Sequence, residues 1–191
     1  MTDYSVLKRE TLLKTPRFSV VHEALRSEEG VYADFTYLDK PNAVAVLPIE
    51  CDSAYLVEQY RHVVGDSLLE VPGGRIESGE KPETAARREL AEECSLSCGE
   101  LVHICTVAPM PSVANEIIHV FLAKSLRPIA AHRDNSEDSI GVCRVDLIQL
   151  GSLLRVDRRI PPVDGFILYH ILVNYYPEFL RSSLQRRSGN E

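Results

Sequence analysis

The amino-acid sequence predicts an α/β fold that mixes several strands with two or three helices. Runs rich in β-branched and aromatic residues, bounded by turn residues, recur along the chain and are typical of strands. Segments of helix-forming residues lie between and after them, and the first of these begins at Pro82. With 191 residues, the chain is long enough for one domain with a sizeable hydrophobic core.

The N-terminal part is expected to be β structure. Residues 18–26 and 31–38 favour strands, and the Ser-Glu-Glu-Gly sequence between them favours a turn, so the pair predicts a β-hairpin. We treat residues 1–42 as a β-rich extension, residues 43–180 as the main domain and residues 181–191 as a polar tail.

The main domain is expected to combine strands with helices. The predicted strands are residues 43–49, 54–60, 102–107, 117–123 and 140–145. Residues 147–154 and 163–176 favour helices, and the second ends before Pro177 because proline interrupts helical hydrogen bonding.

The helix that begins at Pro82 carries three acidic residues on one face. Proline is tolerated in a first helical turn, and the residues that follow favour a helix. Glu89 lies three residues before Glu92 and four before Glu93, so the three carboxylates share one face. Hard divalent cations such as Mg²⁺ take oxygen ligands, and a bound cation would neutralise this face.

A competing interpretation is a solvated acidic face paired with Arg87 and Arg88, because most charge runs are solvated. The preceding residues 69–74 favour a binding site instead. They predict a short strand that enters a tight glycine turn, and glycine lets a backbone approach a ligand closely.

The segment from Gly74 to Leu96 resembles the Nudix box, the signature of hydrolases that cut diphosphates linked to a second moiety. The family pattern is Gly, five residues, Glu, seven residues, Arg-Glu-aliphatic, one residue, Glu-Glu, one residue, Gly-aliphatic. The residues that match it are Gly74, Glu80, Arg88, Glu89, Leu90, Glu92, Glu93 and Leu96. Ser95 replaces the last glycine, so the helix either ends in a left-handed serine, at about 1 kcal/mol, or continues toward Gly99.

The resemblance implies the Nudix α/β/α sandwich with a mixed β-sheet. It also implies that Glu89, Glu92 and Glu93 bind metal, together with the carbonyl of Gly73. Glu93 and Glu92 therefore stand among the catalytic residues. The implied cofactor is Mg²⁺, with Mn²⁺ as an alternative.

Other box residues are implied to be structural. Glu80 and Arg88 would form a buried pair that orients the helix against the loop at Gly74.

The catalytic base is implied to lie in an acidic loop well after the box. Glu137 is the first candidate there and Asp138 the second, although such loops are acidic for many reasons. Glu92 within the box is the alternative.

The flanking residues resemble the ADP-ribose pyrophosphatase group. Arg61 ends a Gln-Tyr-Arg strand as the group's substrate-binding arginine does, and a guanidinium grips phosphate with paired hydrogen bonds. Glu70 is the first residue of a Glu-Val-Pro-Gly-Gly sequence that matches the residues with which the group enters the box. Pro111 matches the proline that marks the group's substrate class. Glu116 is a candidate contact for substrate or metal. The implied reaction cleaves a nucleoside diphosphate sugar, with ADP-ribose, giving AMP and ribose 5-phosphate, as the first candidate.

The loop around Pro111 departs from that group, which has Ser-Pro-Gly where this chain has Met-Pro-Ser. A neighbouring group that acts on GDP-mannose carries a similar methionine-containing loop. GDP-mannose, or another sugar nucleotide or dinucleotide, is therefore an alternative substrate. A ligand-binding module without catalysis is a further alternative, but it predicts a damaged box.

Composition and charge argue against other classes. A net charge of −7 disfavours a nucleic-acid binder, and there is no apolar run long enough to span a membrane. The N-terminus lacks the apolar core of a signal peptide, and five scattered cysteines indicate reduced thiols of a cytoplasmic protein. The N-terminal region resembles the extension through which these enzymes form homodimers, so a homodimer that acts on a small molecule is expected.

Overall fold

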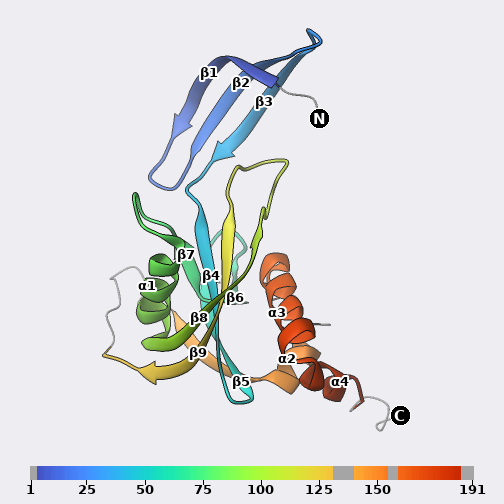
Figure 1. Cartoon of the computed structure of the whole chain (residues 1–191). Helices are drawn as coiled ribbons and strands as arrows, with labels where there is room; N and C mark the ends of the chain where they lie inside the picture. The colour runs from blue at the N-terminus through green and yellow to red at the C-terminus, as the bar shows by residue number, and fades with distance from the viewer. Residues whose placement is uncertain (1–3, 131–139, 155–158, 186–191) are drawn as a thin grey trace. The chain divides into compact units, whose positions relative to one another are not determined.

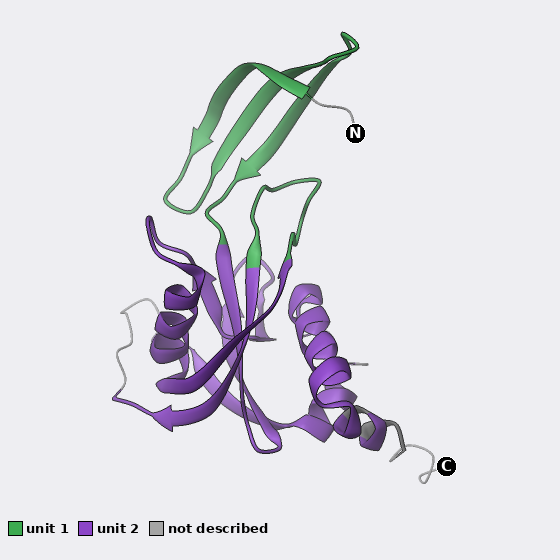
Figure 2. Cartoon of the chain, in the orientation of Figure 1, with its two compact units in different colours: residues 1–42, 107–118 green, residues 43–106, 119–191 purple. Residues whose placement is uncertain are grey.

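The computed structural model describes residues 4–130, 140–154 and 159–185 of the chain. These residues form two compact units (Figure 2). The first unit takes in Met1–Asn42 and Val107–Ile118, and the second takes in Ala43–Thr106 and His119–Glu191.

The first unit contains an antiparallel sheet of three strands, β1 (Tyr4–Lys14), β2 (Ser19–Ser27) and β3 (Tyr32–Asp39) (Figure 1). The predicted hairpin is β2 and β3, with Gly30 at a φ of 83° in its turn. The additional strand β1 did not follow from the sequence. Two register shifts interrupt its pairing with β2, so its residues do not show a clean alternation of polar and apolar side chains.

The rest of the first unit is attached to the end of β3. The Leu38 N–H donates to the Val113 carbonyl at 2.8 Å, and the Asn115 side chain accepts the Lys40 N–H at 2.9 Å. This segment therefore packs with the end of β3.

The second unit is built on a mixed sheet of seven strands in the order β10-β5-β4-β9-β8, where β6 pairs with β5 and β7 pairs with β4. The strands are β4 (Ala43–Glu50), β5 (Ser53–Arg61), β6 (Asp66–Glu70), β7 (Gly73–Arg75), β8 (Leu96–Val107), β9 (Ile118–Pro128) and β10 (Gly141–Asp146). Strands β8 and β9 are longer than predicted, because β8 begins directly after the acidic helix and β9 runs on to Pro128.

Helices cover both faces of this sheet, which confirms the predicted α/β/α sandwich (Figure 1). On one face lies α1 (Pro82–Cys94), and on the other lie α2 (Leu147–Leu153), α3 (Pro162–Tyr175) and α4 (Pro177–Gln185). The sequence predicted the first three. It missed α4, because Pro177 not only ends the preceding helix but also opens the next one. None of the helices within the described ranges is long and apolar enough to cross a membrane.

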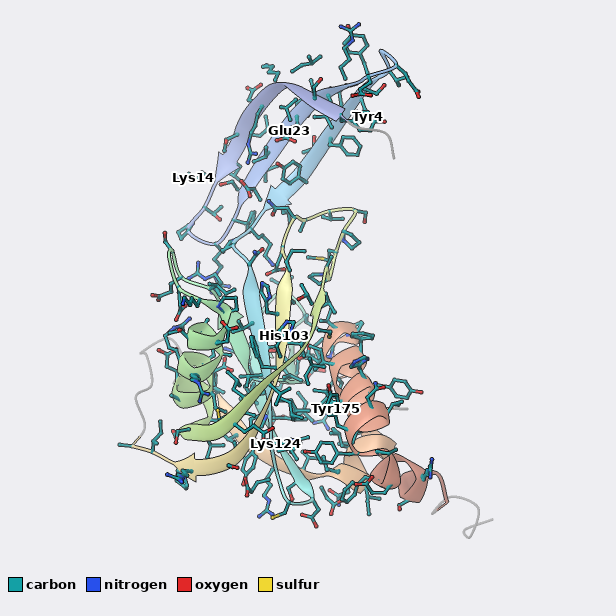
Figure 3. All side chains as sticks on the ribbon, viewed as in Figure 1. Tyr4, Lys14, Glu23, His103, Lys124 and Tyr175 are labelled. Carbon is teal, nitrogen blue, oxygen red and sulfur yellow. The ribbon has the colours of Figure 1, made fainter. Side chains whose placement is uncertain are left out.

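The core of the second unit lies between the sheet and the helices, where side chains fill the space (Figure 3). From α1, the fully buried residues are Ala85, Ala86 and Leu90, which pack with Val44 and Val46 of β4. Because α1 buries this stripe, its acidic residues are left at the edge that faces the turn between β6 and β7.

The structure shows where α1 ends, which the serine at position 95 left open between two possibilities. The helix ends at Cys94, and Ser95 adopts the left-handed conformation with φ 54° and ψ 40°. Its N–H still donates to the Ala91 carbonyl at 3.0 Å. Continuation toward Gly99 is wrong, since Gly99 lies within β8.

Candidate functional site

Two glycines bring the turn after β6 close to its neighbours. Neither has a positive φ, because both belong to the short strand β7. The predicted turn is present, but it lies before the glycines, at Val71 and Pro72, and leads into β7 at Gly73; we call it the Gly73 turn. A Cβ atom at Gly73 would collide with the Val44 carbonyl oxygen, and one at Gly74 would displace the carboxylate of Glu89. Glycine is needed here for close approach to β4 and to α1.

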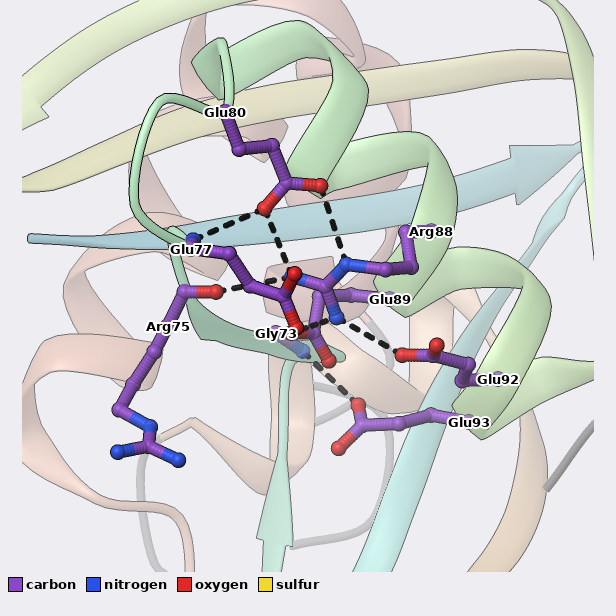
Figure 4. A network of polar contacts seen from close by, with 8 residues as sticks. All are labelled: Gly73, Arg75, Glu77, Glu80, Arg88, Glu89, Glu92 and Glu93. Atoms are coloured by element: carbon purple, nitrogen blue, oxygen red, sulfur yellow. Dashed lines mark hydrogen bonds and ion pairs between the residues drawn. The ribbon is translucent and has the colours of Figure 1, made fainter. Parts of the chain in front are cut away.

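The acidic face of α1 meets this strand. Glu89 and Glu93 are 6% and 7% exposed, which is unusual for glutamate unless the charge is paired. The Gly73 N–H donates to Glu93 Oε2 at 2.9 Å (Figure 4). The turn and the helix are thus joined through two of the residues predicted to bind metal.

Arg88 lies at the centre of the acidic cluster (Figure 4). Its Nε donates to Glu80 Oε1 at 3.1 Å, and its Nη1 donates to Glu89 Oε1 at 2.8 Å and to Glu92 Oε2 at 2.9 Å. Its Nη2 donates to the Arg75 carbonyl at 2.9 Å. The hydrogen bond from Arg88 lowers the pKa of Glu80, and the bond to Glu80 raises the pKa of Arg88 far above its ordinary value. The pair therefore stays ionised at any physiological pH.

This cluster fits a hard divalent cation. Three carboxylates, those of Glu80, Glu89 and Glu92, bond to one guanidinium, and that of Glu93 bonds to the neighbouring Gly73 N–H, so negative charge is in excess. The donors are all oxygens, the atoms that Mg²⁺ prefers. In the part of the chain that the structure describes, no three acidic, histidine or cysteine side chains already converge as a metal site, and Arg88 bonds to two of the candidate ligands instead.

A second charged pair lies beside the cluster. Arg61 Nε donates to Glu70 Oε1 at 2.9 Å, and Arg61 Nη2 contacts Glu70 Oε2. The pKa of Arg61 is raised, mainly by this hydrogen bond and further by the negative charges of Glu93 and Asp164. The structure therefore brings the two predicted substrate residues Arg61 and Glu70 close to Glu93, and it leaves 44% of the Arg61 side chain exposed.

Asp164 is a residue of this region that the sequence did not single out. It lies in the first turn of α3, and its Oδ1 accepts the Val71 N–H at 2.7 Å. Burial raises its pKa to about 6, and the nearby charge of Glu70 adds to the rise. The only local signal was an acidic residue in a predicted first helical turn, and that signal did not indicate a contact 93 positions away in the chain.

The remaining candidates belong to the first unit or lie outside the described residues. Pro111 is exposed, and both it and Glu116 belong to the first unit. Glu116 is buried, and its Oε2 accepts a hydrogen bond from Lys40 Nζ at 2.6 Å. Glu137 and Asp138, the candidates for the catalytic base, lie outside the described residues.

Comparison with known proteins identifies the family of this domain. Residues 39–163, well over half of the chain, match the model of the NUDIX domain. The chain therefore belongs to the NUDIX domain family and is a Nudix hydrolase.

Two relatives and one solved structure show how similar the chain is to particular members. ADP-ribose pyrophosphatase of Bacillus subtilis (strain 168) is 38% identical over 138 residues, 69% of this chain and 75% of that protein. Methanol dehydrogenase activator of Bacillus methanolicus is 39% identical over 111 residues, and the chain spans only 58% of its length. A crystal structure of ADP compounds hydrolase superposes with a TM-score of 0.79 over 95% of this chain and 96% of that one; at 23% identity this shows the fold alone.

Proposed function

We propose that the protein hydrolyses the diphosphate bond of a nucleoside diphosphate sugar in a Mg²⁺-dependent reaction. ADP-ribose, cleaved to AMP and ribose 5-phosphate, is the first candidate substrate. The observation that carries the proposal is the carboxylate cluster of α1, in which Glu93 accepts the Gly73 N–H and Arg88 bonds to both Glu89 and Glu92. The 38% identity to an ADP-ribose pyrophosphatase supports the substrate class.

Each group of the cluster has a task in this proposal. Glu89, Glu92, Glu93 and the Gly73 carbonyl would hold Mg²⁺, with Mn²⁺ as an alternative. The bound metal would supply charge neutralisation for the diphosphate and acidify an attacking water. Arg88 keeps the carboxylates together, since one guanidinium bonds to Glu89 and Glu92 at once.

Arg61 would bind a phosphate of the substrate. Its guanidinium is partly exposed, and Glu70 holds it in one orientation through its Nε and Nη2 atoms. Glu137, with Asp138 or Glu92 as alternatives, would accept the proton of the attacking water.

The Met-Pro-Ser sequence around Pro111 favours a second candidate substrate, GDP-mannose, with other sugar nucleotides behind it. Glu116 is proposed to contact the substrate from the same loop.

The direct test is product analysis of the purified protein with Mg²⁺ against ADP-ribose, GDP-mannose, ADP-glucose, NADH and a nucleoside triphosphate. Glu93→Gln should lower kcat by at least about 10²-fold, because it removes charge from the proposed metal site. Its amide oxygen still accepts the Gly73 N–H, so the fold should persist. Glu83→Gln is the matched control, since Glu83 is an exposed residue of the same helix outside the cluster.

Each outcome has a clear meaning. Fast cleavage of ADP-ribose that Glu93→Gln loses and Glu83→Gln keeps would support the proposal. Preference for GDP-mannose would retain the chemistry and change the substrate. Near-normal turnover by Glu93→Gln would refute the metal assignment, and no turnover of any compound would favour a ligand-binding module.

We also propose a homodimer in the cytoplasm. Exposed apolar residues on β1, namely Val6, Leu7, Leu12 and Leu13, support contact with a second copy of the chain. The five cysteines are all free, as is usual for proteins of a reducing compartment.

A further inference from the structure

Hydrogen bonds from both helical layers hold the Gly73 turn, which consists of Val71, Pro72 and the first residue of β7, Gly73. The Gly73 N–H donates to Glu93 of α1 at 2.9 Å, and the Val71 N–H donates to Asp164 of α3 at 2.7 Å. Pro72 has no N–H, and its carbonyl accepts the Val46 N–H at 2.8 Å. Both backbone donors of the turn are therefore bound by carboxylates, one from each face of the sheet.

The helix that carries Asp164 is well packed. It belongs to the first turn of α3, and four residues of that helix are at most 1% exposed: Ile167, Leu168, Ile171 and Leu172. The chain just before α3 also binds β6, since the Leu69 N–H donates to the Arg159 carbonyl at 2.9 Å. The start of α3 is thus attached to the strand that leads into the turn.

The two carboxylates differ in their tasks. Glu93 would hold the cation in the proposed function as well as the Gly73 N–H, so its oxygens serve two partners. Asp164 lies on the opposite face of the sheet from α1, and its bond to Val71 does not involve the carboxylates of α1. A bond of this kind, from a backbone N–H to a charged acceptor, is among the stronger hydrogen bonds in proteins.

We propose that Asp164 is a positioning residue for the metal-binding turn: by holding the Val71 N–H, it keeps Gly73 opposite the carboxylates of α1. The inference rests on the proposed function, because it takes Gly73 and Glu93 as metal ligands. Asp164 touches neither metal nor substrate in this role. Loss of its acceptor oxygen should weaken the metal site and slow turnover, while substrate binding through Arg61 is changed less.

The test compares three variants of the full chain. Asp164→Ala removes the acceptor, and Asp164→Asn keeps an amide oxygen that can accept the Val71 N–H. Asp146→Ala is the matched control, because Asp146 Oδ1 accepts the Ile148 N–H at 2.8 Å at the start of α2 in the same helical layer. The readouts are Mn²⁺ affinity without substrate, steady-state kinetics with ADP-ribose and Mg²⁺, and the melting temperature.

The expected result is specific to the acceptor. Asp164→Ala should weaken Mn²⁺ binding about tenfold and lower kcat about tenfold, with KM changed by less than about threefold. Asp164→Asn should stay within about threefold of the wild type in both. Asp146→Ala should lower the melting temperature without a change in Mn²⁺ affinity.

Other results would overturn the inference. Wild-type Mn²⁺ affinity and kcat in folded Asp164→Ala would do so, as would equal losses of Mn²⁺ affinity in Asp164→Ala and Asp146→Ala, which would indicate a general loss of stability. If Asp164→Ala does not fold, Asp164→Leu, similar in shape and without an acceptor, takes its place. A wild type that binds Mn²⁺ but cleaves no substrate would refute the proposed function, and the Mn²⁺ affinities would still decide the role of Asp164. A wild type that binds no Mn²⁺ would refute both.

Discussion

Arg88 shows how much one side chain can organise in this protein. Its guanidinium binds three glutamates and the Arg75 carbonyl, which join the helix to the segment that precedes it. Five donors in one plane make these bonds possible, and an ammonium group has only three. The charge also offsets part of the repulsion among the carboxylates.

Arg88→Lys should therefore impair the site although it keeps the charge. We expect kcat to fall about tenfold or more, because one ammonium cannot hold Glu80, Glu89 and Glu92 together. The measurement is steady-state hydrolysis of the preferred substrate beside a circular-dichroism spectrum. Arg87→Lys is the control: Arg87 is exposed and donates to the Cys98 carbonyl outside the cluster. Equal activity of the two variants would contradict the organising role of Arg88.

The ionisation of Asp164 has a consequence for stability. Its pKa in the folded protein, about 6, lies above the ordinary 3.8, so the charged form is disfavoured by folding. Folding therefore favours the protonated carboxyl group of Asp164. This contribution to the free energy of unfolding is fully present below about pH 4 and is lost as the pH rises through about 6. Asp164 faces Glu70 and Arg61, and these charges partly oppose each other at this position.

Asp164→Asn removes this titration. The stability of this variant relative to the wild type should increase between about pH 4 and pH 6 and stay constant above about pH 6. On this plateau we expect the free energy of unfolding to be about 1 kcal/mol or more higher, which raises the melting temperature by about 2–4 °C. Thermal unfolding of both proteins from pH 4 to pH 8 would measure this. A difference in melting temperature that does not vary with pH would show that Asp164 does not titrate in this range.

At the level of elements, α1 has one face that packs against the sheet and another that carries the acidic residues of the candidate site. The buried stripe of Ala85, Ala86 and Leu90 fixes its rotation against the sheet, and its acidic residues consequently meet the Gly73 turn. The helix ends at Cys94 because Ser95 turns the chain into β8 with a left-handed backbone. A serine in that conformation is strained relative to glycine.

Ser95→Gly should relieve this strain. We expect the free energy of unfolding to rise by up to about 1 kcal/mol, since glycine adopts the conformation without a Cβ clash, although it also gains entropy when unfolded. Urea unfolding gives the measurement, and hydrolytic activity should stay unchanged because no carboxylate is affected. Ser97→Gly, in strand β8 two residues later, should destabilise instead. A loss of stability in Ser95→Gly would contradict the strain.

At the level of the whole molecule, the charge and the exposed surface matter. A net charge of −7 repels an anionic substrate, so productive binding depends on local cations such as Arg61 and a bound metal. The three-stranded sheet of the first unit exposes every residue of β1, and about half of the surface of Leu7 and Leu13 is accessible. The apolar side chains of this strand are the surface that the proposed homodimer would cover.

The proposed dimer can be measured directly. Light scattering should give twice the chain mass of 21.4 kDa, and the double variant Leu7→Glu/Leu13→Glu should shift the mass toward 21.4 kDa because it places charges in the contact. Lys8→Glu, on the same strand and exposed, is the control, because it changes the net charge by the same amount without removing an apolar side chain. A wild-type mass of one chain would contradict the dimer.

Much of the fold follows from local patterns in the sequence. The box helix, most strands of the main sheet and the helices at 147–153 and 162–175 were predicted, because periodicity and turn residues act over a few positions. The strand Tyr4–Lys14 was missed because bulges break its alternation. The helix after Pro177 was missed because the same proline ends one helix and begins the next.

In the candidate site, too, the local arrangement could be predicted from the sequence and the long-range contacts could not. The spacing of Glu89, Glu92 and Glu93 sets their common face in any helix, and the bond from Arg88 to Glu92 spans one helical turn. The bonds from Gly73 to Glu93 and from Val71 to Asp164 join residues 20 and 93 positions apart. Such contacts depend on how two helical layers pack against one sheet, and local residue patterns do not encode that packing. The acidic helix could therefore be predicted from the chain alone, whereas the carboxylate that holds the turn from the other face could be found only in the folded molecule.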